Sequence, residues 1–244
     1  MKSTEVTKME KTIRGAAVLS CIVFAAITFA RVMPAGRYEQ ILLAGATVPL
    51  ILSPWLVERL FYCKIYTPLY LFCLFYAIGP MLGVCYGFYY QISWWDKMLH
   101  MFGGIAFALF GTYVFEFFGG EGEKKRLFTA AFALCLSITV SVVWEFAEFS
   151  ADQFFGMDMQ SDRVIHSIRS YSIGEETGMT GTIEHIRSVT VNGKPLPVEG
   201  YLDIGLMDTM LDMLLESLGA VIVAVLYLID RGRHPVLQRR ASAA

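Results

Sequence analysis

Charge and histidine are scarce in this sequence, and their scarcity excludes several classes of protein. Only 17% of the residues are charged, 55% are apolar and the net charge is −2, so nothing indicates binding to nucleic acid. Four histidines are too few for the histidine-box iron sites of membrane desaturases. HExxH, GxSG and GxGD motifs, a P-loop and a dinucleotide-binding fingerprint are also absent. Several familiar families of membrane enzymes are therefore excluded.

Cysteine is present, but not in a disulfide or metal-binding pattern. The five cysteines lie in or beside apolar segments, none lies in the long polar segment 156–205, and no CxxC pair occurs. This arrangement predicts neither a disulfide framework nor a thiolate zinc site.

What the sequence has in abundance is long apolar segments. About 17–25 mostly apolar residues suffice to cross a hydrocarbon core roughly 30 Å thick. Six segments meet this requirement: 15–32, 41–57, 68–90, 98–118, 127–150 and 206–229. The pattern predicts an all-α, polytopic membrane protein with about six transmembrane helices. The lipid bilayer is thus an expected partner, whereas the sequence does not indicate an oligomeric state.

The polar segments complete the predicted organisation. Thirteen lysines and arginines fall on the side of the N-terminus against seven on the other side, which predicts cytoplasmic termini. No convincing cleavage site follows the first apolar segment, so a retained helix is preferred to a signal peptide. The predicted parts are a cytoplasmic basic tail (1–14), transmembrane helices 1–5 (15–155), an extracytoplasmic insert or cap (156–205), transmembrane helix 6 (206–229) and a second cytoplasmic basic tail (230–244). Within the insert, Asn192-Gly193 predicts the turn of a β-hairpin.

Seven acidic residues and one histidine lie within or at the lip of the last three apolar segments. Ionisable groups at membrane depth are costly and usually functional. Residues spaced by three or four share one face of a helix. The eight residues form three such stripes: Asp96 and His100; Glu145, Glu148 and Asp152; Asp208, Asp212 and Glu216. With cytoplasmic termini, all three stripes lie at the extracytoplasmic end, and they predict one buried polar site there.

So many carboxylates at close range require neutralisation in a medium of low dielectric constant. A divalent cation, bound protons or arginines of the insert, such as Arg163 and Arg169, could supply it. Oxygen ligands with one imidazole suit Mg²⁺, Mn²⁺ or Ca²⁺, or Zn²⁺ in a mixed site. We therefore predict a divalent-metal site, with His100 or Glu148 as the catalytic base. The predicted metal ligands are Asp96, His100, Glu145, Glu148, Asp152, Asp208, Asp212 and Glu216.

Individually, most of these residues have simpler explanations. Asp96 and Asp208 could be first-turn acids that stabilise helix N-termini. His100 could be an interior histidine with satisfied hydrogen bonds. Glu145 and Glu216 are predicted to lie deeper and are harder to explain in this way. The case for a site thus depends on the convergence of the three stripes.

Three motifs in these segments resemble the signatures of a known family. Residues 95–104 resemble D-K-x-x-H-x-x-x-G, residues 144–156 resemble W-E-x-x-E-x-x-x-D, and residues 205–220 resemble D-T-x-x-D-x-x-x-x-x-x-G-A. Together they are similar to the YjdF-type bacterial inner-membrane proteins over residues 94–226. The resemblance implies a multi-pass inner-membrane protein and supports the choice of residues, but it implies no reaction. The insert is longer than the connection associated with simpler members.

Three classes of function remain open. The first is a metal-dependent hydrolase or transferase that acts on a lipid-linked or extracytoplasmic small molecule. The second is a cation or proton transporter, which requires a continuous polar path from Glu216 towards Glu116. The third is a non-catalytic scaffold or sensor whose polar network specifies helix packing. A site closed towards the cytoplasm favours the enzyme, whereas a continuous path favours the transporter.

Overall fold

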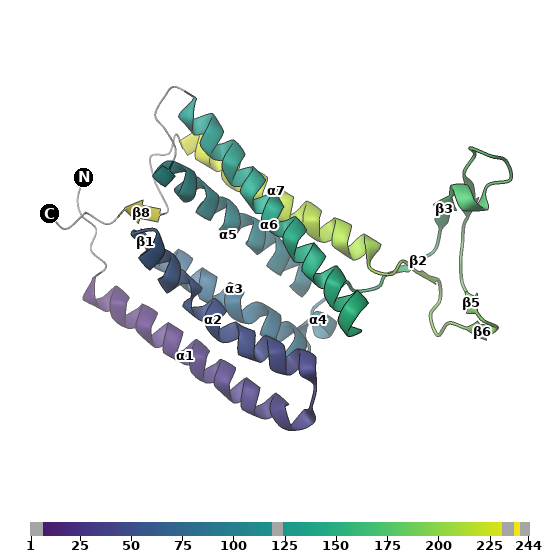
Figure 1. Cartoon of the computed structure of the whole chain (residues 1–244), viewed down its shortest axis with the longest axis horizontal. Coiled ribbons are helices and arrows are strands. Elements are labelled where there is room, and N and C mark those ends of the chain that lie inside the picture. The colour runs from purple at the N-terminus through teal and green to yellow at the C-terminus, as the bar shows by residue number, and fades with distance from the viewer. Residues whose placement is uncertain (1–6, 119–123, 231–236, 240–244) are drawn as a thin grey trace. The chain divides into compact units, whose positions relative to one another are not determined.

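The computed structural model describes residues 7–118, 124–230 and 237–239 (Figure 1). Within these ranges six helices are long and apolar enough to cross a membrane, which confirms the predicted all-α polytopic fold. These helices are α1 (Lys8–Val32), α2 (Tyr38–Leu60), α3 (Thr67–Tyr86), α5 (Trp95–Phe118), α6 (Lys125–Phe155) and α7 (Leu206–Asp230). Shorter helical elements are η1 (Met33–Ala35), α4 (Phe88–Gln91) and η2 (Tyr171–Ile173).

Among the helix boundaries that differ from the predicted ones, the start of α1 and the end of α3 have clear local causes. Helix α1 begins at Lys8, inside the predicted tail 1–14, because Thr7 and Glu10 form a capping box. The third apolar segment was expected to continue to residue 90, but α3 ends at Tyr86. Gly87 follows with φ 75° and caps the helix in the left-handed conformation. The remaining part of that segment forms the separate helix α4.

The chain divides into two compact units, the first being Met1–Val142 with Leu214–Ala244 and the second Val143–Met213. In the first unit, α1, α2 and α3 lie side by side (Figure 1). They enclose an apolar core that includes Ala25, Ile51 and Met81. Strand β1 (Cys63–Ile65) lies between α2 and α3 in the chain and pairs antiparallel with β8 (Leu237–Arg239).

The second unit contains the adjoining ends of α6 and α7 and the insert between them. Across the insert, three short antiparallel ladders pair β2 (Val164–Ile165) with β7 (Tyr201–Leu202), β3 (Ile168–Ser170) with β4 (Gly181–Ile183), and β5 (Thr190–Val191) with β6 (Lys194–Pro195). The predicted hairpin is confirmed, since Asn192 and Gly193 have φ angles of 52° and 77° between β5 and β6. The two strands pair over two residues each, and beyond Pro195 the N–H of Leu196 donates a backbone hydrogen bond of 2.8 Å to the carbonyl oxygen of Val189.

The sidedness of the membrane protein stays a prediction. This applies to the extracytoplasmic insert and to the cytoplasmic termini. Residues 1–6 of the N-terminal tail, and the tail 230–244 except for Asp230 and β8, lie outside the described residues.

Candidate functional site

Helices α5 and α7 approach each other closely at glycine positions. A Cβ on Gly104 of α5 would collide with the backbone of Glu216, and a Cβ on Gly219 of α7 would collide with the backbone oxygen of Met101. Small residues permit such close packing of helices within membranes. The glycines of the sequence motifs therefore set the spacing that brings Glu216 beside α5.

His100 lies between two carboxylates of this helix pair. Its Nε2 is 3.6 Å from Oδ1 of Asp96, and its Nδ1 is 3.7 Å from Oε2 of Glu216. Lys97 donates a hydrogen bond of 2.9 Å from Nζ to Oδ2 of Asp96. His100 and Glu216 are buried, and Asp96 is half-buried. The structure thus brings together three predicted ligands, whose two imidazole–carboxylate distances are longer than direct hydrogen bonds.

Tyr76 of α3 borders the same group and was missed by sequence reasoning. A Cβ on Gly103 would lie 2.7 Å from Oη of Tyr76 and 3.2 Å from Oε1 of Glu216. The hydroxyl of Tyr76 and the carboxylate of Glu216 therefore both lie next to Gly103, in the space that a side chain at this position would occupy. A tyrosine in an apolar segment carries no signal of its own. The sequence signal at this position is Gly103 itself, a second glycine beside Gly104. It indicates that another segment packs closely against α5 here.

The polar face of α6 begins earlier than predicted. Ser137 donates a hydrogen bond of 3.1 Å from Oγ to the carbonyl oxygen of Gly104. Ser141, one turn further along, is buried, and its Oγ has no hydrogen-bond partner within the described ranges. A spacing of four residues puts both serines on the face that carries Glu145. The spacing of four residues could have indicated that the two serines share the face of Glu145. Serine is common in membrane helices, however, so this spacing alone does not predict a site.

In the second unit, the predicted acidic residues of α6 and α7 are mostly buried. Glu145, Glu148, Asp208 and Asp212 are all less than one-tenth exposed, and Asp212 is only 1% exposed. Trp144 donates a hydrogen bond of 2.9 Å from Nε1 to Oε1 of Glu148 and so orients that carboxylate. Buried carboxylates of this kind require charge partners, bound protons or a cation.

Asp152 and Asp208 also connect the insert to the helix ends. Asp152 accepts hydrogen bonds of 2.6 and 2.9 Å from the backbone N–H groups of Met159 and Gln160. Asp208 accepts one of 3.2 Å from the backbone of residue 161, and Nη2 of Arg163 is 3.7 Å from its Oδ1. These contacts give both carboxylates a structural role. Their place among the metal ligands stays a prediction.

Negative charge accumulates where the insert leaves α6. Partial burial, followed by the charges of Asp162, Asp152 and Asp208, raises the pKa of Asp158 above its ordinary value. Asp158 lies outside the spanning helices. Burial and the neighbouring carboxylates thus both disfavour the charged form of Asp158.

A separate polar pair lies further along α5 and α7 in the first unit. Tyr227 donates a hydrogen bond of 2.7 Å from Oη to Oε1 of Glu116. On α7, the buried side chains of Ala220 and Val223 lie between Tyr227 and Glu216 and belong to an apolar cluster. The buried face of α7 is therefore polar, then apolar, then polar, and it offers no continuous polar line from Glu216 to Glu116 within the described residues.

The chain belongs to the family described as "Predicted membrane protein (DUF2238)", whose model matches residues 16–233. The match includes the acidic helices and the insert. The resemblance to YjdF-type proteins is consistent with this assignment. No curated protein and no solved structure matches the chain. The family therefore supports the membrane fold and leaves the reaction to be inferred from the residues themselves.

Proposed function

We propose that this protein is a membrane-embedded, metal-dependent hydrolase or transferase that acts on a lipid-linked or extracytoplasmic substrate. The observation that carries the proposal is the position of His100 between Asp96 and Glu216, at 3.6 and 3.7 Å. An imidazole and two carboxylates held by closely packed helices match the ligand chemistry of Mg²⁺, Mn²⁺, Ca²⁺ or Zn²⁺. Tyr76 adds a hydroxyl group beside the same carboxylate.

Helix periodicity extends this ligand set. Asp212 precedes Glu216 by one turn on α7, and Glu145 follows Ser141 by one turn on α6. Asp212, Glu145 and Glu148 stay in the predicted set of metal ligands. Asp152 and Asp208 stay in the predicted set, with anchoring of the insert as their additional role.

In the proposed reaction, a bound divalent cation would supply an electrophile and an activated water. The residues of the chain hold the cation and accept the proton of the nucleophile. Glu148 suits the role of base because its hydrogen bond with Trp144 fixes its orientation. His100 is the alternative base.

A cation or proton transporter is the second candidate. The buried hydroxyl groups of Ser137 and Ser141 favour it, because they continue the polar face of α6 beyond Glu145. The apolar cluster that contains Ala220 and Val223 opposes it, since it interrupts the face of α7 beyond Glu216. On balance this interruption supports a site closed at one end, as an enzyme requires.

The decisive experiment measures metal in the detergent-purified protein by mass spectrometry. Mg²⁺, Mn²⁺, Ca²⁺ and Zn²⁺ are also titrated while the melting temperature is followed. We expect one of these ions to bind and to raise the melting temperature of the wild type and of Glu116→Gln. We expect His100→Asn and Glu216→Gln to lose the response. Glu116→Gln is the matched control because it removes the same kind of charge elsewhere on α5.

The outcomes separate the three classes of function. If no ion binds to the wild type, the metal-dependent enzyme is wrong. Proton or cation flux in proteoliposomes that is lost in Glu216→Gln would then establish the transporter. Absence of both binding and flux, combined with destabilisation by Glu216→Gln, would establish a structural network.

A further inference from the structure

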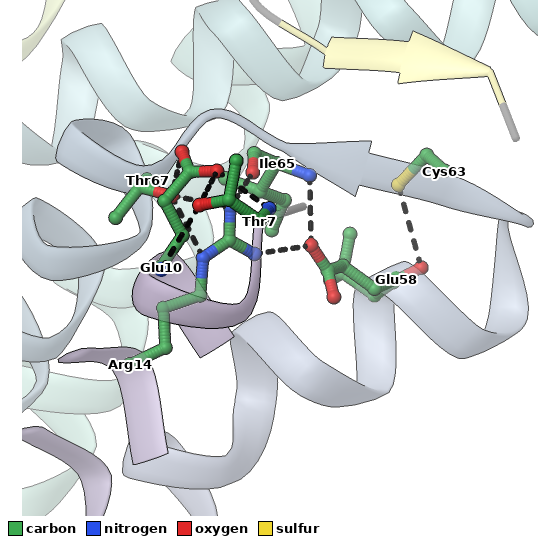
Figure 2. Close-up of polar contacts among 8 residues, drawn as sticks. Thr7, Glu10, Arg14, Glu58, Cys63, Ile65 and Thr67 are labelled. Carbon is green, nitrogen blue, oxygen red and sulfur yellow. Dashed lines mark hydrogen bonds and ion pairs between the residues drawn. The ribbon is translucent and has the colours of Figure 1, made fainter. Parts of the chain in front are cut away.

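Arg14 is the centre of a second buried polar network in the first unit (Figure 2). Its Nη1 forms an ion pair of 2.9 Å with Oε1 of Glu58. Its Nε donates a hydrogen bond of 3.0 Å to the hydroxyl of Thr67, and its Nη2 donates one to the carbonyl oxygen of Ile65. Both charged residues are less than one-tenth exposed. The network connects α1, α2, β1 and the start of α3.

This network holds β1 by its backbone. The N–H group of Ile65 donates a hydrogen bond of 2.9 Å to Oε1 of Glu58, and its carbonyl accepts the bond from Arg14. Both backbone polar groups of Ile65 are thus bound by side chains of α1 and α2. In an antiparallel ladder, successive residues direct these groups towards opposite edges. Lys64 therefore directs its backbone groups towards the other edge, where Gln238 of β8 is its partner.

We propose that β1 is a preformed docking edge for a short extended peptide, and that the C-terminal strand β8 of the same chain is its resident and reversible occupant. The helices hold β1 through the backbone groups of Ile65, which point away from β8. Among the residues that the structure describes, three pairs join the two strands. A two-stranded ladder of this length is marginally stable by itself, so the occupant can exchange while the edge persists. Recognition by strand addition relies mainly on main-chain hydrogen bonds.

The pairing register of β1 with β8 can be tested by disulfide formation, because the native Cys63 lies in β1. Cys63 is the partner of Arg239, and Ile65 is the partner of Leu237. Since Ile65 directs its backbone groups away from β8, its pair is of the non-hydrogen-bonded kind, and so is the pair of Cys63 two residues earlier. The Cα atoms of such pairs lie roughly 4.5 Å apart, within the range for a disulfide.

The first experiment introduces Arg239→Cys into a variant that retains Cys63 and has serine in place of the other four cysteines. The purified protein is oxidised with copper phenanthroline, and linked peptides are identified by mass spectrometry. We expect an intramolecular disulfide between positions 63 and 239. Gln238→Cys is the matched control, because neighbouring strand residues face opposite sides, and we expect at least about fivefold less product from it.

The products also identify the occupant. Equal yields from the two variants, or no product from either, would show that the register is wrong. A disulfide-linked dimer would overturn occupation by the same chain and would assign the edge to a second copy.

Reversibility is tested by competition. A synthetic peptide with the sequence of residues 235–244 is added in excess before oxidation, and a scrambled peptide serves as the control. We expect the native sequence to slow the intramolecular disulfide at least about threefold, as required for exchange at a shared edge. An unchanged rate would contradict a reversible occupant.

The preformed edge is tested by removing the hydroxyl that Arg14 binds. Thr67→Val is expected to lower the yield of the disulfide, whereas Thr28→Val, a change at another buried threonine of the same unit, is expected to leave it unchanged. Equal yields from both would show that the network does not hold the edge. If Thr67→Val does not fold, Lys64→Pro removes the N–H group that faces β8 and should abolish the product. Its survival would overturn docking at this edge.

Discussion

Within the described part of the first unit, the charged residues around Arg14 and those around His100 differ in geometry. Around Arg14, the ion pair with Glu58 measures 2.9 Å, and the guanidinium also binds Thr67. Around His100, the carboxylates of Asp96 and Glu216 lie at 3.6 and 3.7 Å. The first group therefore consists of direct, charge-matched hydrogen bonds. In the second, two carboxylates lie beside one imidazole at distances beyond a hydrogen bond, and Lys97 pairs with Asp96 at 2.9 Å.

This difference separates a structural network from a candidate site. A buried charge that is matched and hydrogen-bonded stabilises one arrangement of the chain, and its removal exposes the partner as an uncompensated charge. An imidazole that lies between two carboxylates favours a proton or a cation at that position. Substitutions in the Arg14 network should therefore act on stability, and substitutions around His100 should act on the binding of an ion.

The largest effect is expected from breaking the Arg14 network. Arg14→Met leaves Glu58 as an unpaired buried charge and should destabilise the protein by about 3–5 kcal/mol. Replacing both residues, in Arg14→Met with Glu58→Leu, should recover part of this loss, because a buried apolar pair needs no charge partner. Unfolding in detergent by denaturant measures both. A double variant that is less stable than the single variant would contradict the assignment of this network to stability.

A smaller loss of stability is expected from Gly104→Ala. The added methyl group meets the backbone of Glu216 and must separate α5 from α7, which should cost about 1–3 kcal/mol. The same separation moves Glu216 away from His100, so the response to the cation should disappear as well. Gly45→Ala is the control, since its nearest contact would be 3.8 Å away. Retention of the cation response in Gly104→Ala would show that close packing of these helices is not needed for binding.

Removal of a single hydroxyl group tests the difference between the candidate site and the structural contacts on a smaller scale. Tyr76→Phe should lower cation affinity by about tenfold, as is usual for groups that orient a ligand, and should change stability by less than about 1 kcal/mol. Tyr113→Phe is the matched control, because the hydroxyl of Tyr113 binds the carbonyl of Phe61 at 2.8 Å. It should change stability to a similar extent and leave the affinity unaltered. Equal affinities of the two variants would remove Tyr76 from the site.

Some of these features could be predicted from the sequence, and others could not. Apolar segment length identified the spanning helices, and spacing by three and four identified the acidic stripes, because both properties are local. The role of Arg14 was not predicted, since a basic residue beside an apolar segment is also typical of an exposed flank. Its partners Glu58 and Thr67 come from distant parts of the chain. Likewise, the hydrogen bonds from the backbone of Met159 and Gln160 to Asp152 depend on the path of the insert, which the sequence does not reveal.

The smallest effect is expected from the pH dependence of the insert. The pKa of Asp158 is raised in the folded protein, by burial first and by nearby carboxylates second. The folded state thus favours the protonated form, and the resulting stability is lost as the pH rises through the raised pKa. Hydrogen exchange of the backbone at residues 159–161, corrected for intrinsic rates, should therefore be less protected at pH 7 than at pH 4.

Asp158→Asn should flatten this dependence. Because Asp158 is largely exposed, the change in opening free energy should stay within about 1 kcal/mol. Glu199→Gln removes an exposed acidic charge elsewhere in the insert and should leave the slope unchanged, whereas a cation that binds near Asp158 should flatten the slope in the wild type. An unaltered slope in Asp158→Asn would show that another group controls the opening. The carboxylates around Asp158 would then not control the stability of residues 159–161.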